Sequence, residues 1–371
     1  MAEKKPRQAK KVRIGELEIG RGVPVRVESM LKNPLEDMAA VAEEIEKLEN
    51  VGCELVRVAF PSRELVPNLE KLLRRTKIAV MVDVHFDFGL AIEATRCGAR
   101  SVRINPGNAR SVRINPGNME NRKGLKKLVE AANKEKVVLR IGANSGSLPD
   151  HVVQRFPKDG GAALAEAVTR QVEVVQDEGF TDLILSAKST EIEETLRANI
   201  FLAQRFDYPL HIGITEAGCG MRGIVKSSCG LARLLSQGIG DTLRVSLTGP
   251  SDEEVLLGQM ILQQMRIRRF GPDLISCPGC GRKRVDVGKL VGLAERYMER
   301  MPGHWTVAVM GCEVNGPREA AHADFGIAGT AGGVVFFSFG RVIGRCDFEK
   351  AEETMVELLE SVLDDEKTCK P

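Results

Sequence analysis

The sequence of 371 residues lacks any apolar run approaching the roughly 20 residues that a membrane-spanning helix needs. Residues 1–11 are charged and no apolar core follows them, so they do not resemble a signal peptide and predict a frayed tail over residues 1–20. The formal net charge is only +2, which gives no global field favouring nucleic acid or a membrane surface. The 9 cysteines are scattered and odd in number, as is typical of reduced thiols. These absences predict a cytoplasmic protein that binds neither nucleic acid nor membrane.

Short apolar stretches alternate with amphipathic stretches through the first two thirds of the chain. The expected strands are residues 25–30, 55–60, 79–85, a Val-Arg-Ile-Asn stretch, 137–144, 182–188, 209–215 and 242–247. The expected helices are residues 35–50, 64–75, 88–97, 119–135, 162–178, 192–205, 224–237 and 253–266. Eight such repeats of about 30 residues predict an α/β fold, a (β/α)8 barrel of the TIM type, over residues 21–270. The alternative is an open doubly wound sheet, which is weakened because no Gly-rich phosphate loop follows the first strand.

The remaining residues, 271–371, predict a small α+β domain. Apolar strands are expected at residues 306–310, 334–338 and 341–344, with helices at 285–300 and 348–363. The glycines from Gly326 to Gly340 fit tight turns near a buried cofactor, or equally ordinary hairpin turns.

One ten-residue stretch occurs twice in tandem. Residues 99–108 and residues 109–118 both read ARSVRINPGN, a period far shorter than a barrel repeat. Only one copy can form the fourth barrel strand. The second copy would leave the extra residues at the face opposite the active site, and this option favours Arg113 over Arg103 as the strand residue.

Nearly every expected barrel strand carries one basic residue among apolar neighbours. The residues are Arg57, Arg103 or Arg113, Arg140, Lys188 and Arg244. Each singly is more often a structural charge in an ion pair. Five cations converging at the carboxyl-terminal mouth of one barrel instead predict a site for a multiply anionic ligand, most simply a diphosphate.

Acid–base candidates lie at the ends of the same strands. Asp83 and His85 end the third expected strand, and Thr215 and Glu216 end the seventh. A carboxylate among so many cations can serve as an ion-pair partner or in catalysis. His151, His211 and His304 are interpreted as loop or core residues without a role.

Two stretches near the C-terminus carry metal-ligand chemistry. Cys277 and Cys280 form a CxxC, Cys312 follows the apolar strand at 306–310, and Glu319 follows one short loop later. Three soft sulfurs favour an iron–sulfur cluster or zinc. A structural zinc site would want a fourth ligand, which His322 could supply. A redox dithiol is the other reading of a CxxC, but no thioredoxin-like βαβ setting surrounds it.

The sequence resembles the 4-hydroxy-3-methylbut-2-enyl diphosphate synthase family of the non-mevalonate isoprenoid pathway, in its bacterial two-domain form. The resemblance is carried by SCPGCGR at 276–282 and GCEVNGPREA at 311–320. It continues through DVHFDFG, SVRINPGN, LRIGANSGSL, AKST, HIGITEAG and GIGDTLRVSL, in the family's order. It implies a 4Fe–4S cluster held by Cys277, Cys280, Cys312 and Glu319.

The same resemblance implies that the substrate is 2-C-methyl-D-erythritol 2,4-cyclodiphosphate and that flavodoxin or ferredoxin supplies electrons. Glu319 would leave the cluster to open one iron, and Glu216 would transfer a proton to the leaving oxygen. A homodimer is implied, in which the cluster domain meets the partner's barrel. The implied substrate-site residues are Arg57, Asp83, His85, Arg103 or Arg113, Arg140, Asn144, Lys188, Thr215, Glu216, Arg244, Ser246, Asn315 and Glu319.

Four stretches depart from the family's usual pattern. Arg318 stands where a glycine is usual, Gly89 stands where an arginine is usual, and Arg222 is shifted along its loop. Residues 28–33 read ESMLKN where QSMTNT is usual.

Two other classes remain open from the residues alone. One is a diphosphate-binding barrel with a structural metal site and no redox role, and the other is an iron–sulfur electron-transfer protein.

Overall fold

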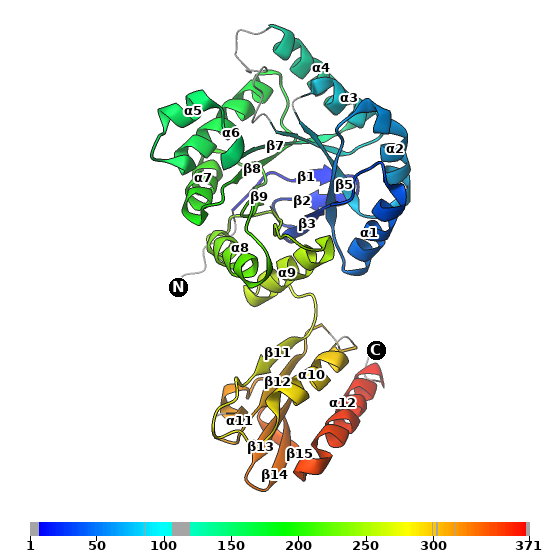
Figure 1. Cartoon of the computed structure of the whole chain (residues 1–371), viewed down its shortest axis with the longest axis vertical. Coiled ribbons are helices and arrows are strands. Elements are labelled where there is room, and N and C mark those ends of the chain that lie inside the picture. The colour runs from blue at the N-terminus through cyan, green and yellow to red at the C-terminus, as the bar shows by residue number, and fades with distance from the viewer. Residues whose placement is uncertain are drawn as a thin grey trace. The chain divides into compact units, whose positions relative to one another are not determined.

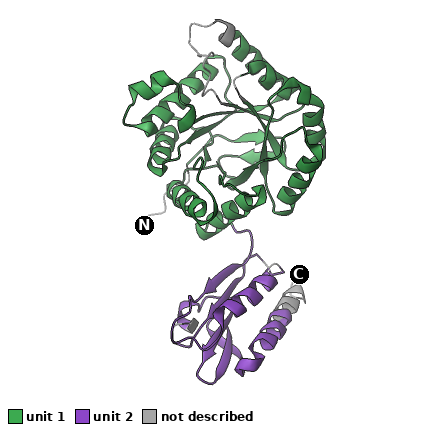
Figure 2. Ribbon diagram, viewed as in Figure 1, with its two compact units in different colours: residues 1–268 green, residues 269–371 purple. Residues whose placement is uncertain are grey.

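The computed structural model describes residues 7–85, 87–105, 119–298, 300–301, 303–314 and 316–368. For His85, Asn105 and residues 119–122, 316–317 and 362–368 it describes the backbone alone. The chain divides into two compact units, Met1–Arg268 and Arg269–Pro371 (Figure 2). In the part of the chain described, no helix combines the length and the apolar character needed to cross a membrane.

Unit 1 is built around eight parallel strands in the order β8-β7-β6-β5-β4-β3-β10-β9. Figure 1 shows helices around these strands. The ring is closed by a parallel bridge between Leu185 and Leu210, where the Leu185 N–H donates to the Pro209 carbonyl over 2.8 Å. The strands are β3 Arg26–Met30, β4 Leu55–Ala59, β5 Ala79–His85, β6 Ser101–Asn105, β7 Val138–Asn144, β8 Leu183–Lys188, β9 His211–Ile212 and β10 Thr242–Leu243. The predicted (β/α)8 barrel is confirmed.

Helices surround the strands and bury one apolar face each. In α1, Val41, Ile45 and Leu48 recur at helical spacing and are buried, and Asp37 caps the helix by accepting from the Ala40 N–H over 3.0 Å. The helices are α1 Met38–Asn50, α2 Val66–Arg75, α3 Phe88–Arg96, α4 Met119–Glu135, α5 Asp150–Arg155, α6 Gly160–Asp177, α7 Ile192–Arg205, α8 Gly220–Leu235 and α9 Ser251–Gln264. Each predicted helix is present, with ends shifted by a few residues.

The last two barrel strands are shorter than predicted. Regular pairing stops at Ile212 in β9 and at Leu243 in β10, with one further hydrogen bond from the Arg244 N–H to the Ile212 carbonyl over 3.0 Å. The expected ends at residues 215 and 247 are therefore wrong. These residues form loops instead, with Thr215 N–H bonded to the Ser189 carbonyl and Thr248 N–H to the Gly218 carbonyl.

The predicted tail over residues 1–20 is wrong for its described part. Strands β1 Val12–Ile14 and β2 Leu17–Ile19 form an antiparallel hairpin. Buried Val12, Ile14 and Ile19 pack on Leu55, Met81, Val138 and Ile184, which lie near the amino ends of four barrel strands. The hairpin therefore closes the amino-terminal end of the barrel. Residues 12–19 read Val-Arg-Ile-Gly-Glu-Leu-Glu-Ile, and this alternation of apolar and polar residues is typical of strands. The tail was predicted instead because the stretch is rich in charged residues.

The fourth barrel strand comes from the first copy of the tandem repeat. Residues Ser101–Asn105 form β6, with Arg103 level with Asp83 on β5 and Arg140 on β7. The preference for the second copy is therefore wrong. The first copy follows Gly98 with few intervening residues, as short helix–strand connections require. Arg113 lies outside the described residues.

Unit 2 is a five-stranded sheet in the order β11-β12-β13-β14-β15. Strands β11 Asp273–Ser276, β12 Thr306–Met310 and β13 Phe325–Thr330 are parallel, and β14 Gly333–Ser338 and β15 Arg341–Cys346 continue the sheet antiparallel. Helices α10 Val287–Met298 and α12 Ala351–Thr368 pack their apolar residues on one face. The short helix α11 Gly316–Glu319 contacts β12 and β13. The predicted α+β unit is confirmed.

Strand β13 was missed because its glycines were read as turns. Gly326 lies inside β13, where a Cβ would come within 2.1 Å of the Phe337 ring on β14. The glycine thus makes room for an aromatic side chain across the sheet. The turn interpretation holds for Gly340, which has a left-handed φ of 72° between β14 and β15.

Candidate functional site

The interior of the barrel holds a set of buried ion pairs. Asp83 on β5 accepts from Arg103 Nη1 on β6 at 2.8 and 3.0 Å, and its Oδ2 lies 3.0 Å from Arg57 Nε on β4. All three side chains are largely buried. Parallel register places Asp83 level with Arg103, whereas Arg57 lies level with Met81, two residues before Asp83 on β5. Residues two apart on a strand share a face, so all three side chains point to the same side of the sheet. One carboxylate therefore holds two guanidinium groups.

A second pair crosses the barrel between strands that are far apart in sequence. Arg140 Nη1 on β7 donates to both Glu28 carboxylate oxygens on β3, at 2.6 and 2.9 Å, and both side chains are fully buried. Arg140 Nε and Nη2 make no hydrogen bond within the described part of the chain. Arg140 consequently retains donor capacity inside the barrel.

Next to this pair, Lys188 at the end of β8 contacts His211 on β9. Lys188 Nζ lies 2.7 Å from His211 Nε2, and His211 Nδ1 lies 2.8 Å from Thr242 Oγ1 and 3.6 Å from Glu28 Oε2. Both side chains are buried. His211, interpreted from sequence as a core residue without a role, thus contacts a predicted site residue directly.

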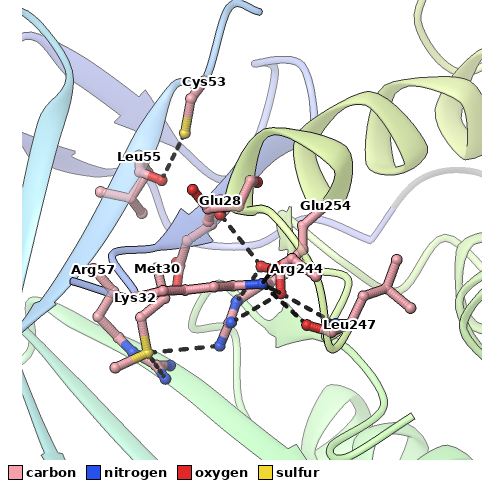
Figure 3. Close-up of polar contacts among 12 residues, drawn as sticks. Glu28, Met30, Lys32, Cys53, Leu55, Arg57, Arg244, Leu247 and Glu254 are labelled. Atoms are coloured by element: carbon pink, nitrogen blue, oxygen red, sulfur yellow. Dashed lines mark hydrogen bonds and ion pairs between the residues drawn. The ribbon is translucent and has the colours of Figure 1, made fainter. Parts of the chain in front are cut away.

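Arg244 is held by a carboxylate from the following helix. Its Nε and Nη2 donate to the buried Glu254 on α9 over 3.1 and 3.3 Å, and Lys32 Nζ lies 3.1 Å from Glu254 Oε1. Figure 3 shows Met30 between Arg57 and Arg244, with its sulfur 2.8 Å from Arg57 Nη2 and 3.7 Å from Arg244 Nη1. Lys32 also donates to the Leu247 carbonyl over 3.0 Å, which ties β3 to the loop that follows β10.

Burial and charge together shift several pKa values in this interior. Burial lowers the pKa of Arg57 to about 9, against the stabilising charge of Asp83. Burial also lowers the pKa of Arg140. Burial alone would raise the pKa of Glu28, but Arg140 and Arg57 outweigh it and hold that pKa below its usual value. Burial and the nearby Arg140 hold the pKa of Lys188 well below its ordinary value. Such shifts are typical of functional sites, although ion-pair networks also produce them.

The remaining predicted residues lie at the strand ends. Asn144 ends β7 and is half-buried, and Thr215 and Ser246 are half-buried in the loops after β9 and β10. Glu216 is exposed and has a left-handed φ of 49°, a conformation that strains a non-glycine residue and recurs at functional sites. The backbone of His85 ends β5 opposite Asn105. Arg113 and Asn315 lie outside the described residues.

Sequence reasoning missed several members of this network, among them Glu28, His211 and Glu254. Glu28 is the lone carboxylate of its strand, but Arg26 and Ser29 also interrupt the apolar pattern there, so the signal is weaker than the one that identified the cations. Glu254 lies in the first turn of α9, where an acidic residue also has an ordinary role at a helix N-terminus. His211 was indistinguishable from a core histidine until its neighbours were known.

In unit 2, two of the predicted thiol ligands, Cys277 and Cys312, follow the carboxyl ends of neighbouring strands. Cys277 directly follows β11 and its N–H donates to the Val309 carbonyl on β12 over 3.0 Å, and Cys312 follows β12 by two residues. A Cβ on Gly311 would lie 3.5 Å from Cys277 Sγ, so this thiol approaches the residue next to Cys312. Adjacent parallel strands thereby bring both cysteines to the same end.

The CxxC turn presents its second thiol to solvent. Gly279 has a left-handed φ of 75°, which favours glycine, and its N–H lies 3.4 Å from Cys277 Sγ. Cys280 is exposed, and a hydrogen bond from the Arg282 backbone lowers the pKa of its thiol. A lowered pKa favours the thiolate that metals bind.

The donor set fits an iron–sulfur group in chemistry. Among the described residues, no three His, Cys, Asp or Glu side chains form a group that could hold a metal ion. Three thiols nevertheless follow the ends of two neighbouring strands, and thiolate is the usual ligand of iron–sulfur clusters. Glu319 is exposed at the end of α11, and His322, the candidate fourth zinc ligand, is exposed three residues later.

The structure shows what lies beside Gly89, one of the positions that depart from the family pattern. A Cβ on Gly89, at the start of α3, would come within 2.6 Å of Arg63 Nη2 and 2.9 Å of Asp87 Oδ1. The Arg63 guanidinium thus occupies the space beside this position. In this chain a cation is therefore present there, but it comes from the loop after β4.

Family models and curated relatives of this chain agree on one family. The family model described as "GcpE TIM-barrel domain" matches residues 9–111 and 109–259, two segments that meet inside the tandem repeat. The "GcpE protein C-terminal domain" matches residues 273–361. Among solved structures, a dihydropteroate synthase from Yersinia pestis covers 69% of this chain and 98% of its own, at 13% identity and a TM-score of 0.45.

Curated relatives are similar across both units. Three of them carry the name "4-hydroxy-3-methylbut-2-en-1-yl diphosphate synthase (flavodoxin)". The protein of Caldicellulosiruptor saccharolyticus is 38% identical over 95% of this chain and 98% of its own length. Those of Thermodesulfovibrio yellowstonii and Geobacter sulfurreducens are 39% and 38% identical over 91% and 96% of this chain, and over 94% and 98% of their own lengths. The chain therefore belongs to the GcpE family, the family of 4-hydroxy-3-methylbut-2-en-1-yl diphosphate synthases.

Proposed function

We propose that this protein reductively opens 2-C-methyl-D-erythritol 2,4-cyclodiphosphate and dehydrates it to 4-hydroxy-3-methylbut-2-enyl diphosphate, a step of isoprenoid biosynthesis. The observation that carries the proposal is full-length similarity to relatives that bear this name, at 38% identity. The cations inside the barrel support it, because a ligand with two phosphate groups requires several positive donors.

In this proposal the barrel binds the cyclic diphosphate at the carboxyl ends of its strands. Arg57, Arg103, Arg140, Lys188 and Arg244 supply the positive charge, and Arg140 Nε and Nη2 supply donors that make no hydrogen bond to the described residues. Asp83 positions Arg57 and Arg103. The half-buried Asn144, Thr215 and Ser246, together with His85, Arg113 and Asn315, are proposed to contribute further contacts by family resemblance.

Cys277, Cys280, Cys312 and Glu319 are proposed to hold a 4Fe–4S cluster. Such a cluster supplies electrons one at a time and, where one ligand is a replaceable oxygen, an iron that can accept a substrate oxygen. The exposed position of Glu319 supports its assignment as the replaceable ligand.

The reaction consumes two electrons and two protons for each substrate, and one substrate oxygen leaves as water. Glu216 is proposed to donate a proton to this leaving oxygen. Its exposure in a strained loop after β9 supports this assignment, because general acids must reach the reacting atoms. Flavodoxin is the proposed electron donor, in agreement with the name of the relatives, and ferredoxin is the alternative.

A homodimer in the cytoplasm is also proposed, by family resemblance. Gel filtration with multi-angle light scattering measures the oligomeric state directly. A monomer at micromolar concentration would contradict it.

The proposed function is tested by anaerobic purification, iron and sulfide analysis, and turnover of the cyclic diphosphate with dithionite as reductant. We expect about four irons per chain and formation of the allylic diphosphate. Zinc in place of iron would overturn the redox mechanism. The alternative of a barrel with a structural metal site and no redox role finds no support in the relatives, whose similarity extends through residues 276–320.

A further inference from the structure

Lys188 differs from the other cations of the barrel in its partners. Each of the four guanidinium groups has a carboxylate within 4.0 Å: Arg57 and Arg103 share Asp83, Arg140 has Glu28, and Arg244 has Glu254. Within the described ranges, no carboxylate oxygen lies that close to Lys188 Nζ, whose hydrogen-bond partner is His211 Nε2 at 2.7 Å. An ammonium group there is therefore not neutralised locally.

The surroundings of Lys188 oppose a positive charge. The side chain is 6% exposed, and a Cβ on Gly213 would lie 2.9 Å from Nζ, so backbone closes the space on that side. The charged groups that act on it are Glu28 from β3, Arg57 from β4, Arg140 from β7 and Arg244 from the end of β10. Three of these four are cations, and His211 on β9 is the remaining titratable neighbour.

His211 is suited to hold Lys188 in both of its protonation states. Burial and the nearby Lys188 keep the pKa of His211 well below its ordinary value, so the imidazole is neutral. With Nδ1–H donating to Thr242 Oγ1 over 2.8 Å, Nε2 is left to accept from Lys188. Either an ammonium or a neutral amine can donate to it. The tautomer therefore need not change when Lys188 gains a proton.

We propose that binding of the anionic substrate is coupled to uptake of one proton by Lys188, with His211 as the residue that positions its Nζ. An incoming phosphate supplies the negative charge that Lys188 lacks, and an opposite charge nearby favours the protonated form. Lys188 thereby adds its charge at the moment when the ligand arrives. This inference rests on the proposed function, because it takes the cyclic diphosphate as the ligand.

The proposed proton uptake predicts the direction in which ligand affinity changes with pH. If the ligand-free site must gain a proton to bind, the affinity falls as the pH rises, by about tenfold per pH unit where uptake reaches one proton. The ligand itself does not obscure this effect. Both of its phosphate groups are doubly substituted and lack the second ionisation that phosphate monoesters show at about pH 6.

The test is isothermal titration calorimetry of the oxidised holoenzyme with the cyclic diphosphate, without reductant so that no turnover occurs. Titrations in buffers of different ionisation enthalpy, at several values from about pH 6 to 9, give the number of protons taken up. We expect uptake that approaches one proton within this range, and a Kd that weakens with rising pH. Binding with no buffer dependence at any pH would overturn the proposal.

Three variants assign the proton. Lys188→Met should abolish the uptake and make the remaining affinity independent of pH. His211→Gln retains an acceptor and should retain the uptake, so its loss there would overturn the assignment to Lys188. Lys32→Met is the matched control, because Lys32, unlike Lys188, has a carboxylate partner, Glu254, at 3.1 Å. This variant should leave the number of protons taken up on binding unchanged.

Failure of this inference and failure of the proposed function give different results. Absence of binding heat in every buffer would contradict the proposed substrate and, with it, this inference. Binding without proton uptake would contradict only the proton coupling. Turnover measured separately with dithionite reports on the proposed reaction in either case.

Discussion

The buried pair between Glu28 and Arg140 allows a quantitative prediction about the stability of the barrel. Both side chains are fully buried and their closest contact is 2.6 Å, and Arg140 has no second carboxylate within 4.0 Å among the described residues. Removing one partner of such a pair leaves an unpaired buried charge and costs about 3–5 kcal/mol. Glu28→Ala should therefore lower the melting temperature of unit 1 by roughly 10 °C. Glu28→Gln should cost less, because the amide still accepts a hydrogen bond from Arg140.

The two units provide an internal control for this measurement. Trp305 is the only tryptophan of the chain and is buried in the core of unit 2. Its fluorescence should report unfolding of unit 2, whereas far-ultraviolet circular dichroism reports both units. Glu28→Ala should shift the transition seen by circular dichroism and leave the Trp305 transition in place. Glu43→Ala, which removes an exposed glutamate on α1, should shift neither.

The pH dependence gives a second check on the same pair. Since the pKa of Glu28 is lower in the folded barrel, its contribution to stability is present above the pKa of the unfolded chain. It is lost as the pH falls through the lower pKa of the folded state. Glu28→Gln should remove this part of the acid sensitivity. A loss below 1 kcal/mol for Glu28→Ala, or equal shifts of both transitions, would refute the reasoning about the buried pair.

Three further predictions concern the other parts of the molecule. Cys312→Ser should lose both bound iron and turnover, whereas Cys346→Ser, in the same unit, should keep both; an active Cys312 variant without iron would refute the ligand set. Glu216→Gln should abolish turnover and leave the cluster spectrum intact, and loss of that spectrum would contradict its role as proton donor. Ile14→Ala removes a fully buried side chain from the N-terminal hairpin and should lower the free energy of unfolding by about 2–5 kcal/mol in a denaturant titration.

The barrel could be predicted because each of its strands and helices is indicated by the residues within that element. Each strand and helix shows its own periodicity, and a cation such as Arg57 or Arg140 is conspicuous inside an apolar strand. The carboxylate partners were not predictable in the same way. Glu28 and Arg140 are 112 residues apart, so their pairing depends on the closure of the whole ring. Sequence reasoning therefore identified the cations and offered Asp83 as an ion-pair or catalytic candidate, but it assigned no role to Glu28 or Glu254.

The tandem repeat shows a different limit. Both copies contain the same residues, so local propensity cannot choose between Arg103 and Arg113. The choice follows from the connections on either side of the strand, where a short link from Gly98 places the first copy in β6. In unit 2 the spacing of the cysteines indicated candidate metal ligands, but strand β13 could not be predicted, because Gly326 is explained only by the Phe337 ring opposite it.

The hairpin at residues 12–19 also has a consequence for how the barrel folds. Its apolar face packs on strands as distant in sequence as β8, where Ile184 lies about 170 residues further along the chain. During synthesis these residues therefore emerge long before their binding surface exists, and contacts of such sequence separation form slowly. Docking of the hairpin should be a late event, which follows closure of the ring. A segment that precedes every barrel strand in the sequence would then be the last to complete the barrel.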